Sequence, residues 1–246
     1  MTTPLSLRAV DFAFNNDNSI FKNLSLELGR ESPVMILGSS GCGKTTLLHL
    51  LAGLLIPIQG EIAGNSVPVS MAFQEPRLLP WKNALENVSL PLTQRMEKTA
   101  AEKRARDFLR YVSMENKAAS YPRELSGGQK QRLNLARAFA CPCELLLMDE
   151  PFQSQDIPLR LELMELTRSL LDVSRNPPQS DTRLAVIVTH DPREAIYLGK
   201  RIIALGKKGR GVIYDEVLDL SEDERAYGSA TQVKIEKQLL DLLRGN

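Results

Sequence analysis

The chain is poor in the residues from which disulfide frameworks, zinc sites and strongly charged surfaces are built. Its 246 residues include only 3 Cys and 2 His, and the Cys residues form no C-x-x-C pair. An odd number of cysteines without that spacing supports neither a disulfide framework nor a metal site, and it indicates a reducing compartment. Lys and Arg total 31 against 30 Asp and Glu, so the net charge is +1. This balance argues against nucleic acid as a partner held by net charge.

Long apolar segments are also missing. The most apolar window, residues 47–58, contains His49 and Pro57 and is shorter than the ~20 residues that a membrane-spanning helix needs. The first residues show no basic segment followed by an apolar stretch and a cleavage site, so we do not expect a secretory signal or export. Any association with a membrane is therefore expected to depend on a partner.

What is present is an ordinary globular composition with the pattern of an α/β protein. Hydrophobic residues make up 43% and charged residues 25% of the chain. Alternating residues predict an antiparallel hairpin, and short apolar runs predict buried strands. The hairpin is expected at 5–14 and 21–28, further strands at 33–37, 69–73, 144–148 and 184–188, helices at 46–53, 159–173 and 234–243, mostly helical structure over 75–140, and a loop at 176–182.

A glycine-rich segment follows the predicted strand 33–37. Residues 38–45 satisfy the pattern G-x-x-x-x-G-K-[ST] between a strand and a helix, which favours a phosphate-binding loop over a simple glycine turn. Backbone N–H groups of such a loop point at phosphate oxygens, the Lys44 ammonium lies near the terminal phosphates, and the Thr45 hydroxyl binds Mg²⁺. The residues expected to bind the nucleotide here are Gly38, Ser39, Ser40, Gly41, Cys42, Gly43, Lys44, Thr45 and Thr46.

Two carboxylates end the predicted strand 144–148. Ligands bind where the carboxyl ends of parallel strands meet, so Asp149 is placed to bind Mg²⁺. Glu150, one residue further, is placed to orient or deprotonate the water that attacks the γ-phosphate. The alternative is an exposed acidic pair that merely ends a strand before Pro151. Because the chain also carries a P-loop, we favour the functional interpretation, which predicts hydrolysis.

A second candidate phosphate site precedes a helical stretch. Residues 125–129 read Leu-Ser-Gly-Gly-Gln, and Ser126 with Gln129 fits a capping box, which is the structural alternative. The consecutive glycines Gly127 and Gly128 are costly for a cap alone, and they allow an anion to approach the positive end of a helix. If two chains pair head to tail, each supplies its Ser-Gly-Gly to the P-loop of the other. A two-fold dimer with two composite sites follows.

Together these motifs resemble the ATP-binding cassette (ABC) ATPases over nearly the whole chain, because Leu-Ser-Gly-Gly-Gln is the signature sequence of that family. The resemblance implies that Mg-ATP is bound and hydrolysed. It also implies an α/β fold with a RecA-like P-loop core, an antiparallel β subdomain and an inserted α-helical subdomain. The core with its β edge is expected at 1–74 and 142–246, and the helical subdomain with the signature at 75–141.

The resemblance further implies roles for residues outside these motifs. Phe14 would stack on adenine, although a core Phe is the alternative. Gln74 would be the Q-loop glutamine that contacts Mg²⁺ and the water, although a lone Gln after a strand is usually a surface residue. His190, at the end of the predicted strand 184–188, would be the switch histidine that touches the γ-phosphate, although a lone His is more often structural.

Two segments depart from the family. Residues 58–73 are shorter than the family's usual β-hairpin region, and the second departure lies in the D-loop. Residues 153–156 read Gln-Ser-Gln-Asp, where the family usually has a small residue, Ala, Leu and Asp. Asp156 would be the D-loop aspartate. Because Gln155 puts a polar side chain where the family has an apolar one, we expect communication between the two sites of a dimer to be weaker or differently tuned.

Residues 75–81, Glu-Pro-Arg-Leu-Leu-Pro-Trp, are similar to the corresponding loop of bacterial importers for nitrate, sulfonates, taurine and thiamine precursors. Trp81, the only Trp, is expected either to anchor a partner or to lie beneath the helical lobe. The resemblance implies a peripheral subunit at the cytoplasmic face of the plasma (inner) membrane. Its partners would be transmembrane permease subunits and, indirectly, a periplasmic or lipoprotein solute-binding protein.

Two other functions compete with import. A soluble ABC ATPase without a transport role usually carries a coiled coil or two cassettes, and this chain has no long heptad run. A nucleotide-binding scaffold that does not hydrolyse ATP is disfavoured because Glu150 and His190 are both present.

Overall fold

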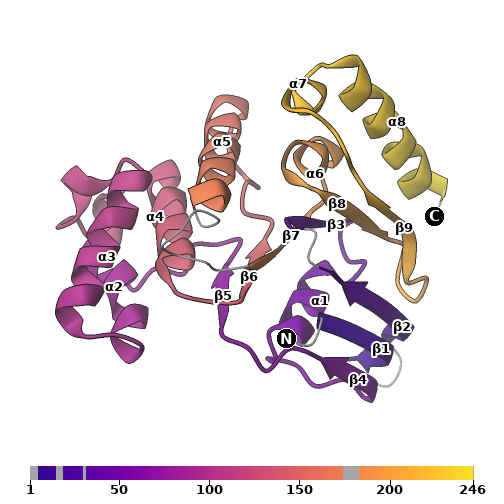
Figure 1. Cartoon of the computed structure of the whole chain (residues 1–246), viewed down its shortest axis with the longest axis horizontal. Coiled ribbons are helices and arrows are strands. Elements are labelled where there is room, and N and C mark those ends of the chain that lie inside the picture. Colours follow the sequence, from indigo (N-terminus) through magenta and orange to yellow (C-terminus); the bar gives the residue numbers. More distant parts are fainter. Residues whose placement is uncertain (1–4, 15–18, 30–31, 174–182, 246) are drawn as a thin grey trace. The chain divides into compact units, whose positions relative to one another are not determined.

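The computed structural model describes residues 5–14, 19–29, 32–173 and 183–245 (Figure 1). The chain forms two compact units. Unit 1 comprises residues 1–67 and 184–246, and unit 2 comprises residues 68–183. Since unit 1 is built from both ends of the sequence, the P-loop and the predicted strand 184–188 belong to the same unit.

Unit 1 contains a three-stranded antiparallel sheet in the order β2-β1-β4. The predicted hairpin is confirmed as β1 (Leu5–Ala13) and β2 (Ser19–Leu28). The third strand, β4 (Gln59–Ala63), pairs with β1 and was not predicted. Its sequence lacks apolar alternation, and Gly60 adopts a φ of 82° where a Cβ atom would lie 2.4 Å from the carbonyl oxygens of Arg8 and Ala9. The close approach of the β4 backbone to β1, which requires glycine at position 60, therefore marks this strand better than any hydrophobic pattern does.

The second sheet of unit 1 has the order β7-β3-β8-β9. The completely buried β3 (Val34–Gly38) pairs in parallel with β7 (Leu184–Thr189) and β8 (Arg201–Leu205), and β9 (Val212–Val217) is antiparallel to β8. The predictions of β3 and β7 are confirmed, whereas β8 and β9 were not predicted. Because burial on both faces removes alternation, β3 is recognisable only as an unbroken apolar run.

Within its described residues, unit 1 also contains four helices, two of which pack against β3 and β7. The predicted helices at 46–53 and 234–243 are confirmed as α1 (Lys44–Leu51) and α8 (Ala230–Gly245), while α6 (Pro192–Leu198) and α7 (Glu222–Arg225) were not predicted. Helix α8 contacts α6, and an ion pair of 2.7 Å between Arg193 and Glu236 joins the two helices.

Unit 2 combines two parallel strands with a set of helices. The predicted strands at 69–73 and 144–148 are confirmed as β5 (Val69–Ala72) and β6 (Leu145–Asp149), and the structure pairs them in parallel. The mostly helical character of 75–140 is also confirmed, but its first helix begins only at Ala84, and residues 75–83 form a loop. The helical segments are α2 (Ala84–Ser89), η1 (Leu90–Gln94), α3 (Lys98–Tyr111), η2 (Glu115–Lys117), η3 (Pro122–Glu124), α4 (Gly127–Ala140) and α5 (Ile157–Val173).

Three further outcomes concern the limits of the prediction. The loop expected at 176–182 lies outside the described residues. The subdomain boundaries expected at residues 75 and 141 stay a prediction. In the described part of the chain, no helix combines the length and apolar composition needed to cross a bilayer.

Candidate functional site

The P-loop segment connects β3 to α1 in unit 1. Gly41 and Gly43 adopt φ values of 79° and 110°, which side chains rarely tolerate. The Lys44 ammonium is buried and donates hydrogen bonds of 2.9 Å to the Gly38 carbonyl oxygen and 3.2 Å to that of Ser39. The Lys44 side chain therefore folds back onto the start of the P-loop. Residues 39–41 of the loop are exposed.

The start of helix α1 suits an anion. Its N-cap residue is Gly43, and a glycine has no side chain with which to satisfy the first backbone N–H groups of a helix. A Cβ atom on Gly43 would lie 2.6 Å from Ile20 Cγ2, so packing also requires glycine there. The Thr45 side chain is exposed on the first turn, whereas Cys42 and Thr46 are buried. Contacts from those two residues to a phosphate are thus expected to run through their backbone.

His190 leaves the sheet beside the P-loop. Strands β3 and β7 are parallel neighbours in which Leu37 pairs with Thr189, so Gly38 and His190 follow directly at the same edge. The Thr189 hydroxyl donates to the buried carboxylate of Glu194 and accepts a 3.1 Å hydrogen bond from the Asp191 N–H group. These bonds fix the backbone on both sides of the exposed His190.

Phe14 lies at the end of β1. Its side chain is 60% exposed, while Phe12 is 6% exposed. The two rings meet edge to face with their centroids 5.1 Å apart. Phe12 is therefore the core residue of the pair, and the exposed Phe14 ring is available to a flat ligand. Its stacking on adenine stays a prediction.

Unit 2 repeats this arrangement with its own pair of parallel strands. Ala72 of β5 pairs with Met148 of β6, so Gln74 and the Asp149-Glu150 pair follow at the same edge of these strands. Asp149 is 6% exposed. Glu150 has a φ of 40°, a costly backbone conformation for a non-glycine residue and one that is frequent at functional sites. Unit 2 thus brings two of the candidate metal ligands, Gln74 and Asp149, to the same strand edge as the candidate base Glu150.

The signature residues begin helix α4. The Ser126 hydroxyl accepts a 3.2 Å hydrogen bond from the Gln129 N–H group, and the Gln129 side chain accepts a 3.0 Å bond from the Ser126 N–H group. The capping box is therefore present. It does not explain Gly127, where a Cβ atom would meet nothing within 4 Å among the described residues and where φ is not positive. Gly128 packs closely, since its Cβ atom would lie 2.8 Å from Leu159.

Asp156 caps helix α5 in this chain. Its side chain accepts a 3.3 Å hydrogen bond from the Leu159 N–H group, and its carbonyl oxygen accepts a 2.9 Å bond from the Arg160 N–H group. Its role as the D-loop aspartate stays a prediction.

Two residues of α4 that support the Q-loop escaped the sequence analysis. Asn134 is fully buried and donates a 2.8 Å hydrogen bond to the Phe73 carbonyl oxygen. Arg137 donates a 3.0 Å bond to the Arg77 carbonyl oxygen and another to that of Pro76, and burial lowers the pKa of its guanidinium. The only sequence signal for them was polar residues on a helix face whose other buried residues are mostly apolar.

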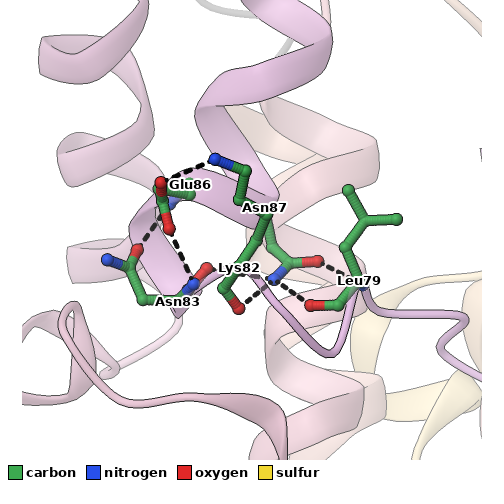
Figure 2. Close-up of polar contacts among 5 residues, drawn as sticks. All are labelled: Leu79, Lys82, Asn83, Glu86 and Asn87. Atoms are coloured by element: carbon green, nitrogen blue, oxygen red, sulfur yellow. Dashed lines mark hydrogen bonds and ion pairs between the residues drawn. The ribbon is translucent and has the colours of Figure 1, made fainter.

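The side-chain amide of Asn87 binds the backbone of the loop that carries Trp81, and Figure 2 shows its contacts with Leu79 and Lys82. Asn87 is 1% exposed, and its Nδ2 atom donates to the carbonyl oxygens of Leu79, Lys82 and Asn83 at 2.9–3.2 Å. Its Oδ1 atom accepts a 2.8 Å bond from the Leu79 N–H group. Trp81 itself is 69% exposed, so the interpretation as a Trp buried beneath the helical lobe is wrong.

Helix α2 begins in the same network. Asn83 and Glu86 form a capping box with hydrogen bonds of 2.8 and 2.9 Å, and the Lys82 ammonium lies 2.9 Å from the Glu86 carboxylate. The hydrogen bond from Lys82, followed by that from the Asn83 N–H group, lowers the pKa of Glu86. A rigid, polar framework therefore presents the exposed indole.

Replacing Asn87→Ala is expected to lower the free energy of unfolding by about 1–3 kcal/mol, because three partly buried carbonyl groups lose a donor and the Leu79 N–H group loses its acceptor. Since Trp81 is the only Trp, its fluorescence reports on this loop alone, and the emission of the folded protein should shift as the loop loosens. Urea titration followed by fluorescence and by circular dichroism measures both effects. The exposed Asn116→Ala is the matched control, and an Asn87→Ala protein that equals it in both measurements would contradict the framework role.

Comparison with known proteins places the chain in a family. Residues 21–153 match the family model described as ABC transporter. The chain is 37% identical over 97% of its length to the aliphatic sulfonates import ATP-binding protein SsuB of Shigella flexneri serotype 5b (strain 8401), covering 90% of that protein. It is 38% identical over 98% of its length to the SsuB protein of Granulibacter bethesdensis, covering 95% of it.

Solved structures agree with this placement. A dimeric bacterial ABC transporter cassette shares 31% identity at a TM-score of 0.73, covering 88% of this chain and 100% of that one. A dimeric post-hydrolysis cassette bound to ADP and Pi shares 30% identity at the same TM-score of 0.73, with the same coverage. The expected RecA-like α/β fold of the ABC ATPases is thereby confirmed, and the chain belongs to the ABC transporter family.

Proposed function

We propose that this chain is the ATP-hydrolysing subunit of a bacterial ABC importer, in which two chains paired head to tail bind Mg-ATP and drive solute uptake through membrane subunits. The observation that carries the proposal is that, in both units, the candidate site residues follow the carboxyl ends of two paired parallel strands. In each unit, two parallel strands end at one edge with the residues that nucleotide hydrolysis needs. The relatives whose printed names include ATP-binding and import support the same function.

In this proposal, different residues bind the nucleotide and carry out its hydrolysis. The P-loop backbone and Lys44 hold the phosphates, and Phe14 stacks on adenine. Glu150 accepts a proton from the attacking water, or orients it, and His190 contacts the γ-phosphate.

Mg²⁺, when bound, neutralises charge that builds up on the phosphate oxygens. Thr45, Gln74 and Asp149 offer a hydroxyl, an amide oxygen and a carboxylate, which are the hard oxygen donors that this ion prefers. Two features of the structure suit the role, namely the exposed Thr45 hydroxyl on the first turn of α1 and the Asp149 carboxylate at the end of β6.

The signature segment acts on the nucleotide of the other chain in this proposal. Gly127 supports this assignment, because neither packing nor backbone conformation within the described chain requires glycine there. A bare backbone at the N-terminus of α4 allows the closest approach of a phosphate. The signature residues contributed to the partner are Ser126, Gly127, Gly128 and Gln129, and Asp156 is the D-loop residue of the same interface.

The membrane partners are permease subunits at the cytoplasmic face of the plasma (inner) membrane, where the chain binds as a peripheral subunit. An exposed indole on a rigid loop is the kind of group that anchors a protein interface, which supports a role for Trp81 in this contact. A periplasmic or lipoprotein solute-binding protein takes part indirectly. Solute choice belongs to these other subunits.

The proposal is tested on the wild-type chain with two measurements. Phosphate release from ATP should require Mg²⁺, vanish with excess EDTA and return when Mg²⁺ is restored. Light scattering should show dimers with Mg-ATP and monomers without nucleotide. Hydrolysis that persists in EDTA would contradict the metal role, and a chain that hydrolyses ATP as a monomer at every concentration would contradict the head-to-tail site.

A further inference from the structure

The Q-loop glutamine is held by a residue that the family does not usually have. Gln74 and Gln153 both belong to unit 2, and Nε2 of Gln74 donates a hydrogen bond to Oε1 of Gln153. We propose that Gln153 is a positioning residue, which fixes the Gln74 side-chain amide so that its Oε1 oxygen is the atom left to coordinate Mg²⁺. This inference rests on the proposed function, because it concerns how Gln74 performs the role given to it there.

The backbone on the Q-loop side is already fixed. Asn134 binds the Phe73 carbonyl oxygen at 2.8 Å, and Arg137 binds those of Pro76 and Arg77. The guanidinium of Arg77 lies 4.6 Å from the centre of the Phe73 ring, which adds a cation–π contact. Helix α4 therefore holds the chain before and after Gln74, and the orientation of the Gln74 side chain is decided by its own contacts.

The partner segment is equally well held. The Gln153 N–H group donates a 3.2 Å hydrogen bond to the Glu150 carbonyl oxygen, which closes a turn directly after the candidate base. The buried side chain of Gln131, also on α4, donates to the Pro151 carbonyl oxygen within that turn. The half-buried Gln153 thus extends from a fixed turn, and one helix supports both ends of the glutamine pair.

The chemistry of a primary amide gives the contact its consequence. A glutamine side chain has one donor end and one acceptor end, and only the oxygen can bind a cation. Because Gln153 accepts a hydrogen bond from Nε2 of Gln74, the contact favours the Gln74 rotamer in which Oε1 is still available to bind a cation. A small residue at position 153, as the family usually has, is too short to make this bond. Gln153 therefore selects an orientation of the Gln74 side chain. Family members with a small residue at this position need another contact to select it.

The test compares variants that keep or remove the acceptor. Gln153→Glu retains an acceptor of the same length, Gln153→Met removes it at nearly constant size, and the exposed Gln94→Met is the matched control. The first readout does not depend on activity. The side-chain NH₂ resonances of Gln74 in the nucleotide-free full-length chain, assigned by their loss in Gln74→Ala, should move in Gln153→Met and stay near their wild-type position in Gln153→Glu.

Kinetics provide the second readout. For Gln153→Met we expect kcat to fall about fivefold and the Mg²⁺ concentration for half-maximal rate to rise by a similar factor, with little change in KM for ATP, since the loss is about one hydrogen bond. Gln153→Glu should restore both values. In the Gln74→Ala background, Gln153→Met should have no further effect.

The outcomes separate the inference from the proposed function. Unmoved Gln74 resonances in Gln153→Met, or moved resonances with wild-type kcat and Mg²⁺ dependence, would overturn the positioning role while leaving hydrolysis by this site intact. Full activity of Gln74→Ala would instead overturn the assignment of Gln74 itself, and the inference with it. An equal loss in Gln153→Glu and Gln153→Met would show that acceptor chemistry is not what matters.

Discussion

Substituting Glu150→Gln is expected to lower the rate of ATP hydrolysis by roughly a hundredfold to ten-thousandfold, the range usual for loss of a general base. Gln has the size of Glu but cannot accept the proton of the attacking water at neutral pH. The side chain follows directly after β6 in a turn fixed by the Gln153 N–H group, so the substitution changes the chemistry of the group with little change in shape.

The same variant is expected to accumulate as a dimer in Mg-ATP. If ATP joins two chains and hydrolysis releases them, then blocking hydrolysis without blocking binding should lengthen the life of the dimer. Light scattering of Glu150→Gln with and without Mg-ATP checks this, together with phosphate release. The exposed Glu165→Gln on α5 is the matched control and should behave as wild type. Unchanged turnover in Glu150→Gln would remove Glu150 from the mechanism.

Much of the candidate site could be predicted because its residues directly follow buried strands, which are easy to recognise in the sequence. Completely buried strands such as β3 and β6 have unbroken apolar sequences, and the residues that follow them must lie at a sheet edge. The positions of the P-loop, Asp149 and His190 at such edges therefore followed from local sequence. The structure adds the register, because Leu37 pairs with Thr189 and Ala72 with Met148.

Exposure and side-chain contacts could not be predicted in this way. Phe14 and Trp81 are aromatic residues with apolar neighbours in the sequence, and such residues are usually buried. They are exposed because Phe12 fills the core position in β1 and because the Asn87 amide holds the loop around Trp81. The first cause depends on which face of β1 is covered, and the second depends on side-chain hydrogen bonds that a pattern of apolar and polar residues does not specify.

Helix α4 shows the same limit more sharply. Its sequence predicts a cap at Ser126 and a helix that follows, and both are present. Gln131, Asn134 and Arg137 then contact the turn after Glu150 and the loop around Gln74, which are segments about 20 and 60 residues away along the chain. A period of 3.6 residues identifies the inward face of a helix, but not the partners of the polar groups on it. These contacts join helix α4 to both loops of its unit that carry candidate catalytic residues.

Replacing Arg225→Met is expected to destabilise the protein more than any other single substitution considered, by about 3–5 kcal/mol. Arg225 is 9% exposed, and its guanidinium donates to four backbone carbonyl groups. The distances are 3.2 Å to Leu220, 2.9 Å to Ile196 and 2.9 Å to Leu218, and a fourth bond goes to Gly199. Met fills similar space but satisfies none of these acceptors, which stay buried.

This loss should appear as a decrease in Tm of about 6–20 °C, since 1 kcal/mol corresponds to about 2–4 °C in a protein of this size. Arg225→Lys should fall between wild type and Arg225→Met, because a single ammonium cannot reach four carbonyls spread around a planar guanidinium. The exposed Arg244→Met at the end of α8 is the matched control. The bonds to Ile196 and Gly199 hold the end of α6, the helix that begins just after His190, so loosening them should also lower ATP turnover. A Tm of Arg225→Met equal to that of Arg244→Met would show that water replaces the guanidinium at no cost.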